Sequence, residues 1–156
     1  MGALRIGWML GLLMLSVPAQ AQEADLADEA ELHFQLGVDA YLARRYRAAL
    51  EHLLLSNRLA PNPGVAFNIG RAYEKLGEYS RAYTYYRAAA ESWEREDRRA
   101  TARASIEAIR PRLALVEVTT DPPGAAVYID RVNLGQRGTT PLIIAVEPGE
   151  HDIIVE

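Results

Sequence analysis

Two consecutive stretches decide the fold of the first part of the chain: AELHFQLGVDAYLARRYRAALEHLLLSNRLAPN at 30–62 and PGVAFNIGRAYEKLGEYSRAYTYYRAAAESWER at 63–95. Their apolar residues recur with helical spacing. With an offset of 33, small residues fall on small ones and large apolar residues on large apolar ones: Gly37 on Gly70, Ala49 on Ala82, Leu36 on Ile69, Tyr46 on Tyr79 and Leu53 on Tyr86. The sequence therefore predicts two similar helical hairpins.

The two aligned glycines indicate where the helices of each hairpin meet. A glycine inside a helix costs about 0.5–1 kcal/mol relative to alanine, so a repeated mid-helix glycine needs a packing reason. We expect Gly37 and Gly70 to lie against Ala49 and Ala82, with the larger apolar residues filling the remaining space. Turns are predicted at 43–45 and 76–78, and the prolines of 60–64 end the first hairpin.

The pattern resembles the tetratricopeptide repeat. Its hallmark positions are occupied in the first copy by Leu36-Gly37, Tyr46, Ala49, Leu53, Ser56 and Pro61, and in the second by Ile69-Gly70, Ala72-Tyr73, Tyr79, Ala82, Tyr86 and Ala89. The match is degenerate, because His33 and Ala66 stand where the family has a large aromatic residue and the second copy lacks a closing proline.

This resemblance implies an α-hairpin solenoid whose first helices line a concave groove that binds a protein or peptide partner. Tyr41 and Phe67 are expected to supply apolar anchors there, and Arg71 with Lys75 to hold an acidic group. The alternative is that these positions serve packing alone. The groove candidates are Phe34, Val38, Tyr41, Phe67, Asn68, Arg71, Glu74 and Lys75.

One more amphipathic helix is predicted at 97–110, before Pro111. We expect it to cap the open side of the second hairpin through Ala100, Ala104, Ile106 and Ile109, since stacked repeats expose a core face at their ends. The alternative is a third, decayed hairpin. The helical part thus runs over 24–110, with repeats at 30–62 and 63–95.

After Pro111 the apolar period changes to two, which predicts strands at 113–119, 125–130, 141–147 and 150–156. A turn at Pro123-Gly124 requires a positive φ at the glycine. The stretch resembles a PEGA domain, on these residues: Pro122-Pro123-Gly124-Ala125, Val127-Tyr128-Ile129-Asp130, Leu134-Gly135, Thr139-Thr140-Pro141-Leu142, and Pro148-Gly149 before His151. Proline replaces the motif's glutamate. The resemblance implies a small all-β, sandwich-like module of extracytoplasmic bacterial proteins, giving α and β in separate units.

The module is small and acidic, with seven carboxylate side chains, two arginines and a net charge of −5 over 113–156. Forty-four residues without a disulfide are close to the lower limit for independent folding. We expect that the module is truncated and that the chain continues past Glu156; the alternative is that its sheet is completed against the helices or another chain.

The first 21 residues are predicted to be a cleaved signal peptide. Arg5 precedes an apolar run over 6–17, which Pro18 and Ala19-Gln20-Ala21 follow, and this order is typical of a secretory leader. An uncleaved anchor is the alternative, although a run of 12 residues is short for a span. Cleavage after Ala21 implies an exported protein of the periplasm or cell envelope.

No residue pattern in the chain nominates a reaction. The 156 residues contain no cysteine, their three histidines (His33, His52 and His151) are scattered, and no phosphate-binding glycine motif is present. We therefore expect no catalytic residues, no metal, no cofactor and, with a net charge of −4, no nucleic acid. The favoured hypothesis is a non-enzymatic scaffold protein of the bacterial envelope. The alternative is that the β-module binds cell-wall polysaccharide or peptidoglycan, with Tyr128 as the candidate contact residue.

Overall fold

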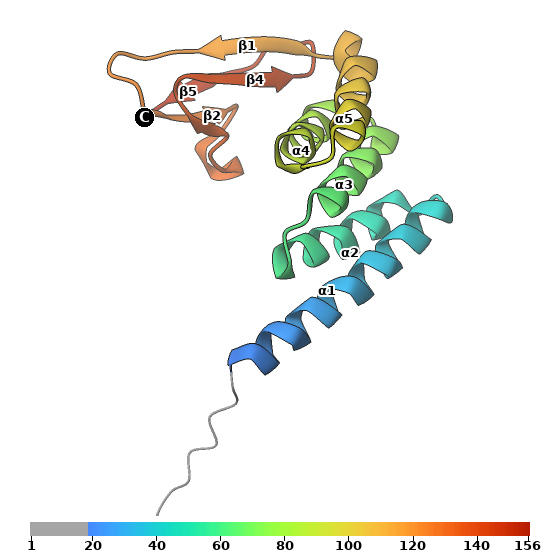
Figure 1. Cartoon of the computed structure of the whole chain (residues 1–156). Helices are drawn as coiled ribbons and strands as arrows, with labels where there is room; N and C mark the ends of the chain where they lie inside the picture. The colour runs from blue at the N-terminus through green and yellow to red at the C-terminus, as the bar shows by residue number, and fades with distance from the viewer. Residues whose placement is uncertain (1–18) are drawn as a thin grey trace, which may run out of the picture.

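The structure, a computed structural model, describes residues 19–156. Five helices are followed by short strands (Figure 1). The helices are α1 (Ala19–Leu42), α2 (Tyr46–Leu59), α3 (Pro63–Leu76), α4 (Tyr79–Ser92) and α5 (Glu96–Ile109), and the strands are β1 (Ala114–Val118), β2 (Ala126–Ile129), β3 (Gly138–Thr139), β4 (Leu142–Val146) and β5 (Ile153–Val155). The predicted leader lies outside the described residues except for 19–21, which begin α1, so its cleavage stays a prediction.

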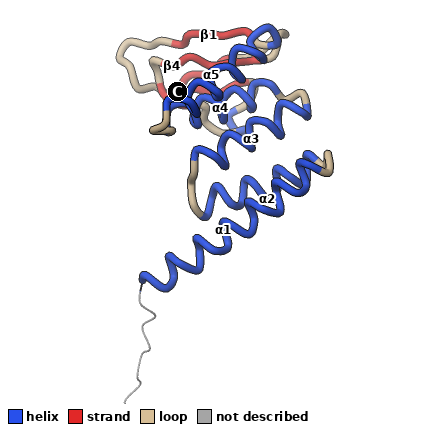
Figure 2. The backbone as a smooth tube through the Cα atoms, turned by 45° about the vertical axis from the view of Figure 1, so that its right-hand side comes forward, coloured by secondary structure: helices blue, strands red, loops and turns tan. Residues whose placement is uncertain are grey.

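The helices form two hairpins and a cap, in chain order. Helix α1 packs on α2, α3 on α4, α2 on α3 and α5 on α4. Figure 2 shows the same succession, with α1 at one end and the strands beside α4 and α5 at the other. Arg44, with φ of 60°, and Gly77, with φ of 77°, occupy the same left-handed turn position in the two hairpins and are 33 residues apart. The predicted repeat is therefore present in the backbone.

Close approach of the helices depends on the two glycines. A Cβ atom at Gly37 would lie 2.6 Å from Cγ of Leu53, and one at Gly70 would lie 2.6 Å from Cδ1 of Tyr86. Ala49 and Ala82 are fully buried. The prediction of where the helices meet is confirmed.

Two predicted details of the helical hairpins are wrong. Pro63 and Gly64 belong to the first turn of α3, because Asn62 caps that helix by accepting a hydrogen bond from the Gly64 amide at 2.7 Å. Leu36 is 40% exposed, whereas its counterpart Ile69 is fully buried, since among the described residues only α3 has a preceding hairpin packed on it.

In the capping helix α5 the buried face differs from the predicted one. Ala100 and Ala104 are exposed, and the residues that pack on the second hairpin are Ala102, Ile106 and Ile109. Ala102 precedes Ile106 by four residues and Ile109 by seven, which is helical spacing, whereas Ala104 precedes Ile109 by five and falls on another face. The capping position itself is as predicted.

The C-terminal module consists of two small antiparallel sheets. One pairs β1 with β4, matching Leu115 to Ala145, and the other has the order β3-β2-β5. The short strand β3 lies between the predicted strands 125–130 and 141–147, in a stretch for which we predicted no strand. Gly124 has the positive φ, 105°, that its predicted turn requires. Five buried apolar residues fill the space between the sheets: Val118, Val127, Ile129, Ile144 and Val146. The predicted fold class, helical hairpins followed by a small β-module, is confirmed.

The helices and the module share part of one core. Leu113, Leu115 and Ala145 pack with the helical residues rather than with the inner face of the two sheets. The other face of β4 covers the module's own core through Ile144 and Val146. Packing of the module against the helices is thus observed, and the expectation that the chain continues past Glu156 stays a prediction.

No helix within residues 19–156 combines the length and apolar character needed to cross a membrane.

Candidate functional site

The predicted groove residues cluster where α1 meets α3. The guanidinium of Arg71 on α3 lies 4.5 Å from the centre of the Tyr41 ring on α1, a cation–π contact between the two hairpins. Asn68 accepts a hydrogen bond from Nη1 of Arg71 through Oδ1 at 3.3 Å. Its own amide donates to the carbonyl of Gly64 at 2.9 Å, which fixes the orientation of the side chain. Arg71 is therefore held over an aromatic ring while half-exposed to solvent.

Glu74 is drawn towards the helix core. Its Oε2 accepts a 2.5 Å hydrogen bond from the hydroxyl of Tyr86, a buried residue of α4. Burial, followed by this hydrogen bond to Glu74, raises the pKa of Tyr86, so the phenol remains a donor at neutral pH. Glu74 therefore accepts the hydrogen bond of a buried hydroxyl group. From the sequence we predicted that its side chain faces the groove, and this contact with the core was not expected.

The two phenylalanines differ from the expectation of free apolar anchors. Phe67 is half-buried, with its ring centre 5.2 Å from that of Tyr86 and 5.4 Å from that of Trp93. Phe34 packs against the helical core and lines a shallow cavity of about 230 Å³. Val38 is half-buried and Lys75 exposed. Of the eight predicted residues, the structure brings Tyr41 and Asn68 into contact with Arg71.

His33 and His52 join the first hairpin. Their Nδ1 atoms are 3.1 Å apart, and the two rings are stacked with their centres 5.3 Å apart and an interplanar angle of 26°. This geometry fits one Nδ1–H group donating to the other ring's Nδ1 lone pair.

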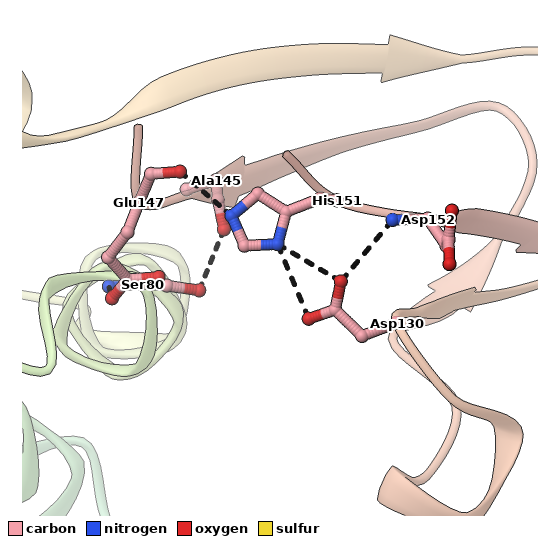
Figure 3. Close-up of polar contacts among 6 residues, drawn as sticks. All are labelled: Ser80, Asp130, Ala145, Glu147, His151 and Asp152. Atoms are coloured by element: carbon pink, nitrogen blue, oxygen red, sulfur yellow. Dashed lines mark hydrogen bonds and ion pairs between the residues drawn. The ribbon is translucent and has the colours of Figure 1, made fainter. Parts of the chain in front are cut away.

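A second polar cluster was missed by the sequence reasoning, and it centres on His151 (Figure 3). Its Nδ1 lies 3.1 Å from Oδ1 of Asp130, and its Nε2 lies 2.9 Å from the carbonyl oxygen of Glu147. A carboxylate and a carbonyl accept hydrogen bonds only, so both ring nitrogens must donate, as they do in the imidazolium form. The hydrogen bond to Asp130 and then that to Glu147 raise the pKa of His151.

This cluster ties the β4–β5 turn to the first turn of α4. The carboxylate of Glu147 accepts a hydrogen bond from the Ser80 backbone amide at 2.9 Å, and the Ser80 hydroxyl donates to the Ala145 carbonyl at 2.7 Å. The residue before α4, Glu78, makes no capping bond of its own. A carboxylate at a helix N-terminus satisfies a free amide and complements the helix dipole. The module therefore caps a helix of the repeat array.

Ser80, His151 and Asp130 hold the backbone together and do not form a catalytic triad. Nε2 of His151 is bonded to a backbone carbonyl and the Ser80 hydroxyl to another, so the ring has no nitrogen left to accept a proton from that serine. Within residues 19–156, no group of three or more histidine, aspartate and glutamate side chains could hold a metal ion. Asp130 and His151 are 21 residues apart, and the only sequence signal was that both stand in the PEGA pattern.

The His151–Asp130 contact predicts a pH-dependent stability. The pKa of the folded-state imidazole is raised, so its contribution is fully present below the ordinary histidine pKa of about 6.5 and is lost as the pH rises through the raised value. We expect wild type to exceed His151→Gln in free energy of unfolding at pH 5.5 by about 0.2–1 kcal/mol, as for a partly exposed ion pair, and by less at pH 8.5. Urea unfolding at both values measures this. An equal difference at both would contradict it.

Comparison with known proteins bears on the C-terminal part. Residues 113–156 match the family model of the PEGA domain, a domain often found in extracellular proteins. Among curated proteins, none matches the chain. The five preceding helices fit a helical repeat in their packing. The β-module that follows the helical hairpins of this chain is therefore a PEGA domain.

Proposed function

We propose that this chain is a non-enzymatic interaction protein of the bacterial cell envelope, in which tetratricopeptide-type hairpins bind a partner peptide on the face formed by α1 and α3. The contact that carries the proposal is the stacking of Arg71 on Tyr41, which joins the two hairpins and leaves a half-exposed cation over an aromatic ring. Arginine and tyrosine are the residue types that dominate binding energy in protein interfaces.

The surroundings of this contact suit an acidic or extended peptide. Lys75 is exposed one helical turn from Arg71, and Asn68, whose amide is fixed by Gly64, steadies the guanidinium. A held side chain loses less conformational entropy on binding than a free one. We also propose export by a signal peptide cleaved after Ala21, in agreement with the extracellular occurrence of PEGA domains.

Replacing Tyr41 and Arg71 together by alanine should abolish partner binding. We expect the double variant of the chain to retain less than about a tenth of the partner captured from an envelope extract, since interface anchors are each worth about 2 kcal/mol or more. The measurement is quantitative mass spectrometry of the captured proteins. Arg47→Ala, an exposed arginine on α2, is the matched control and should capture as much as wild type. Equal capture by the double variant would contradict the proposal.

Binding of cell-wall polysaccharide or peptidoglycan through Tyr128 is the second hypothesis. Tyr128 lies on the central strand β2, opposite Ile154 of β5, and its side chain is half-buried. The contact between Arg71 and Tyr41 makes the hairpin face the better-supported site.

A further inference from the structure

A cleft separates α4 from the PEGA domain and is lined by residues of both. It consists of two adjoining cavities of about 140 and 300 Å³, which share Thr84 of α4 and Arg137 of the segment before β3. Ligand sites are commonly found between two structural units and have volumes of about 300–1,000 Å³. The cleft has no residue in common with the proposed peptide-binding face, so the two can be tested separately.

The charge of the cleft lining is entirely positive. Arg81, Arg87 and Arg137 line the two cavities, and no aspartate or glutamate does. This contrasts with the PEGA domain as a whole, which has seven acidic residues and, besides Arg137, only Arg131 as a basic one. A concave surface with a single sign of charge concentrates ligands of the opposite sign.

The three arginines differ in whether a nearby glutamate already pairs with their charge. Arg81 is paired with Glu78 at 2.9 Å, and Arg87 approaches Glu91 at 3.6 Å, both outside the cavity lining. Within residues 19–156, the ion pairs found do not involve Arg137. Arg137 is therefore the cation with the greatest capacity for a bound anion.

An aromatic platform forms one wall of the larger cavity. The rings of Tyr73 and Tyr85 lie 5.7 Å apart at an interplanar angle of 25°, and the guanidinium of Arg81 lies 5.5 Å from the centre of the Tyr73 ring. Leu134 and Arg137 stand on the opposite, PEGA side of that cavity. A planar aromatic wall facing a cation suits a ligand that has both an apolar face and a negative charge.

We propose that this cleft binds an anionic saccharide, a sugar unit that bears a carboxylate or a phosphate group. The guanidinium of Arg137, with Arg81 or Arg87, would hold the anionic group through paired hydrogen bonds. The C–H face of the sugar would pack on the half-buried Tyr85 ring, which Tyr73 backs, and Thr84 and Gln136 would form hydrogen bonds with the sugar hydroxyl groups. Contacts from both units mean that the ligand bridges the helices and the PEGA domain.

Calorimetric titration of the chain with three related sugars tests this proposal. The probes are N-acetylmuramic acid, which bears a carboxylate, N-acetylglucosamine 1-phosphate, which bears a phosphate, and neutral N-acetylglucosamine. We expect at least one anionic sugar to bind about 10-fold or more tightly than the neutral one, in line with the value of a charge-assisted hydrogen bond. Which of the two binds identifies the anionic group.

Arg137→Ala should weaken that binding by about 10-fold, whereas Arg131→Ala, the other arginine of the domain, should leave it within about 2-fold. Arg137→Lys keeps the charge and should lie between the two, since lysine lacks the paired donors. Equal binding of the neutral and anionic sugars, no binding of any at millimolar concentration, or equal losses in the two alanine variants would each overturn the proposal. So would binding of a hexaglutamate peptide alone, which would assign the cleft to acidic peptides.

Discussion

Gly70→Val is expected to lower the free energy of unfolding by about 2–3 kcal/mol, at the upper end of the cost of overpacking a core. The first added carbon would lie 2.6 Å from Cδ1 of Tyr86 and 2.7 Å from its Cε1. Tyr86 is 1% exposed and its hydroxyl is held by Glu74, so the ring has no free direction in which to move. Helices α3 and α4 must separate instead, and chemical denaturation followed by circular dichroism would report the loss.

Two further substitutions separate this clash from an effect of glycine as such. Gly70→Ala gains about 0.5–1 kcal/mol of helix propensity but adds the same clashing Cβ, so a smaller net destabilisation is expected. Gly149→Ala is the control, because its Cβ would meet nothing nearer than Nε2 of His151 at 3.8 Å, and its effect should stay within about 0.5 kcal/mol. A stability of Gly70→Val equal to wild type would mean that the two helices do not meet at this glycine.

The sequence was most informative in the two hairpins, because the same packing contact occurs in each of them. Gly37 and Gly70 stand at the same position of two hairpins, and the buried side chains of Leu53 and Tyr86 face them, so the repeat shows twice that glycine is required there. The exposure of Leu36 could not be read in this way, because it depends on what covers α1 from outside and not on the local pattern. Periodicity reports which residues share a face, while burial depends on the neighbours that this face meets.

The contacts that join the two units were beyond sequence reasoning for a different reason. Ser80 and Ala145 are 65 residues apart, and a serine near a helix start and an alanine in a strand are ordinary in their own elements. The same holds for Arg137, whose place in the cleft depends on how the PEGA domain sits on α4. The strand β3 was missed because its two residues, one of them glycine, show no alternation.

Ala145→Asp is expected to cost about 3 kcal/mol, because it buries an unpaired carboxylate, and to uncouple the PEGA domain from the helices. Ala145 is 6% exposed and packs in the helical core cluster with Leu113 and Leu115. Its backbone carbonyl, which accepts the Ser80 hydroxyl, is unchanged by the substitution. The added carboxylate would enter an apolar contact that the domain, with 44 residues, needs for its stability. Differential scanning calorimetry should show one transition for wild type and a separate, earlier one for the variant.

The matched control for this change is Ala114→Asp, which makes the same replacement on the neighbouring strand at an exposed position. We expect it to change the stability by less than about 0.5 kcal/mol and to keep the single transition. Two transitions in wild type would show that the helices and the PEGA domain fold independently, and the shared core would then contribute little. If wild type shows a single transition and only Ala145→Asp divides it, the domain depends on the helices for its stability. Ala145 also lines the arginine-lined cleft.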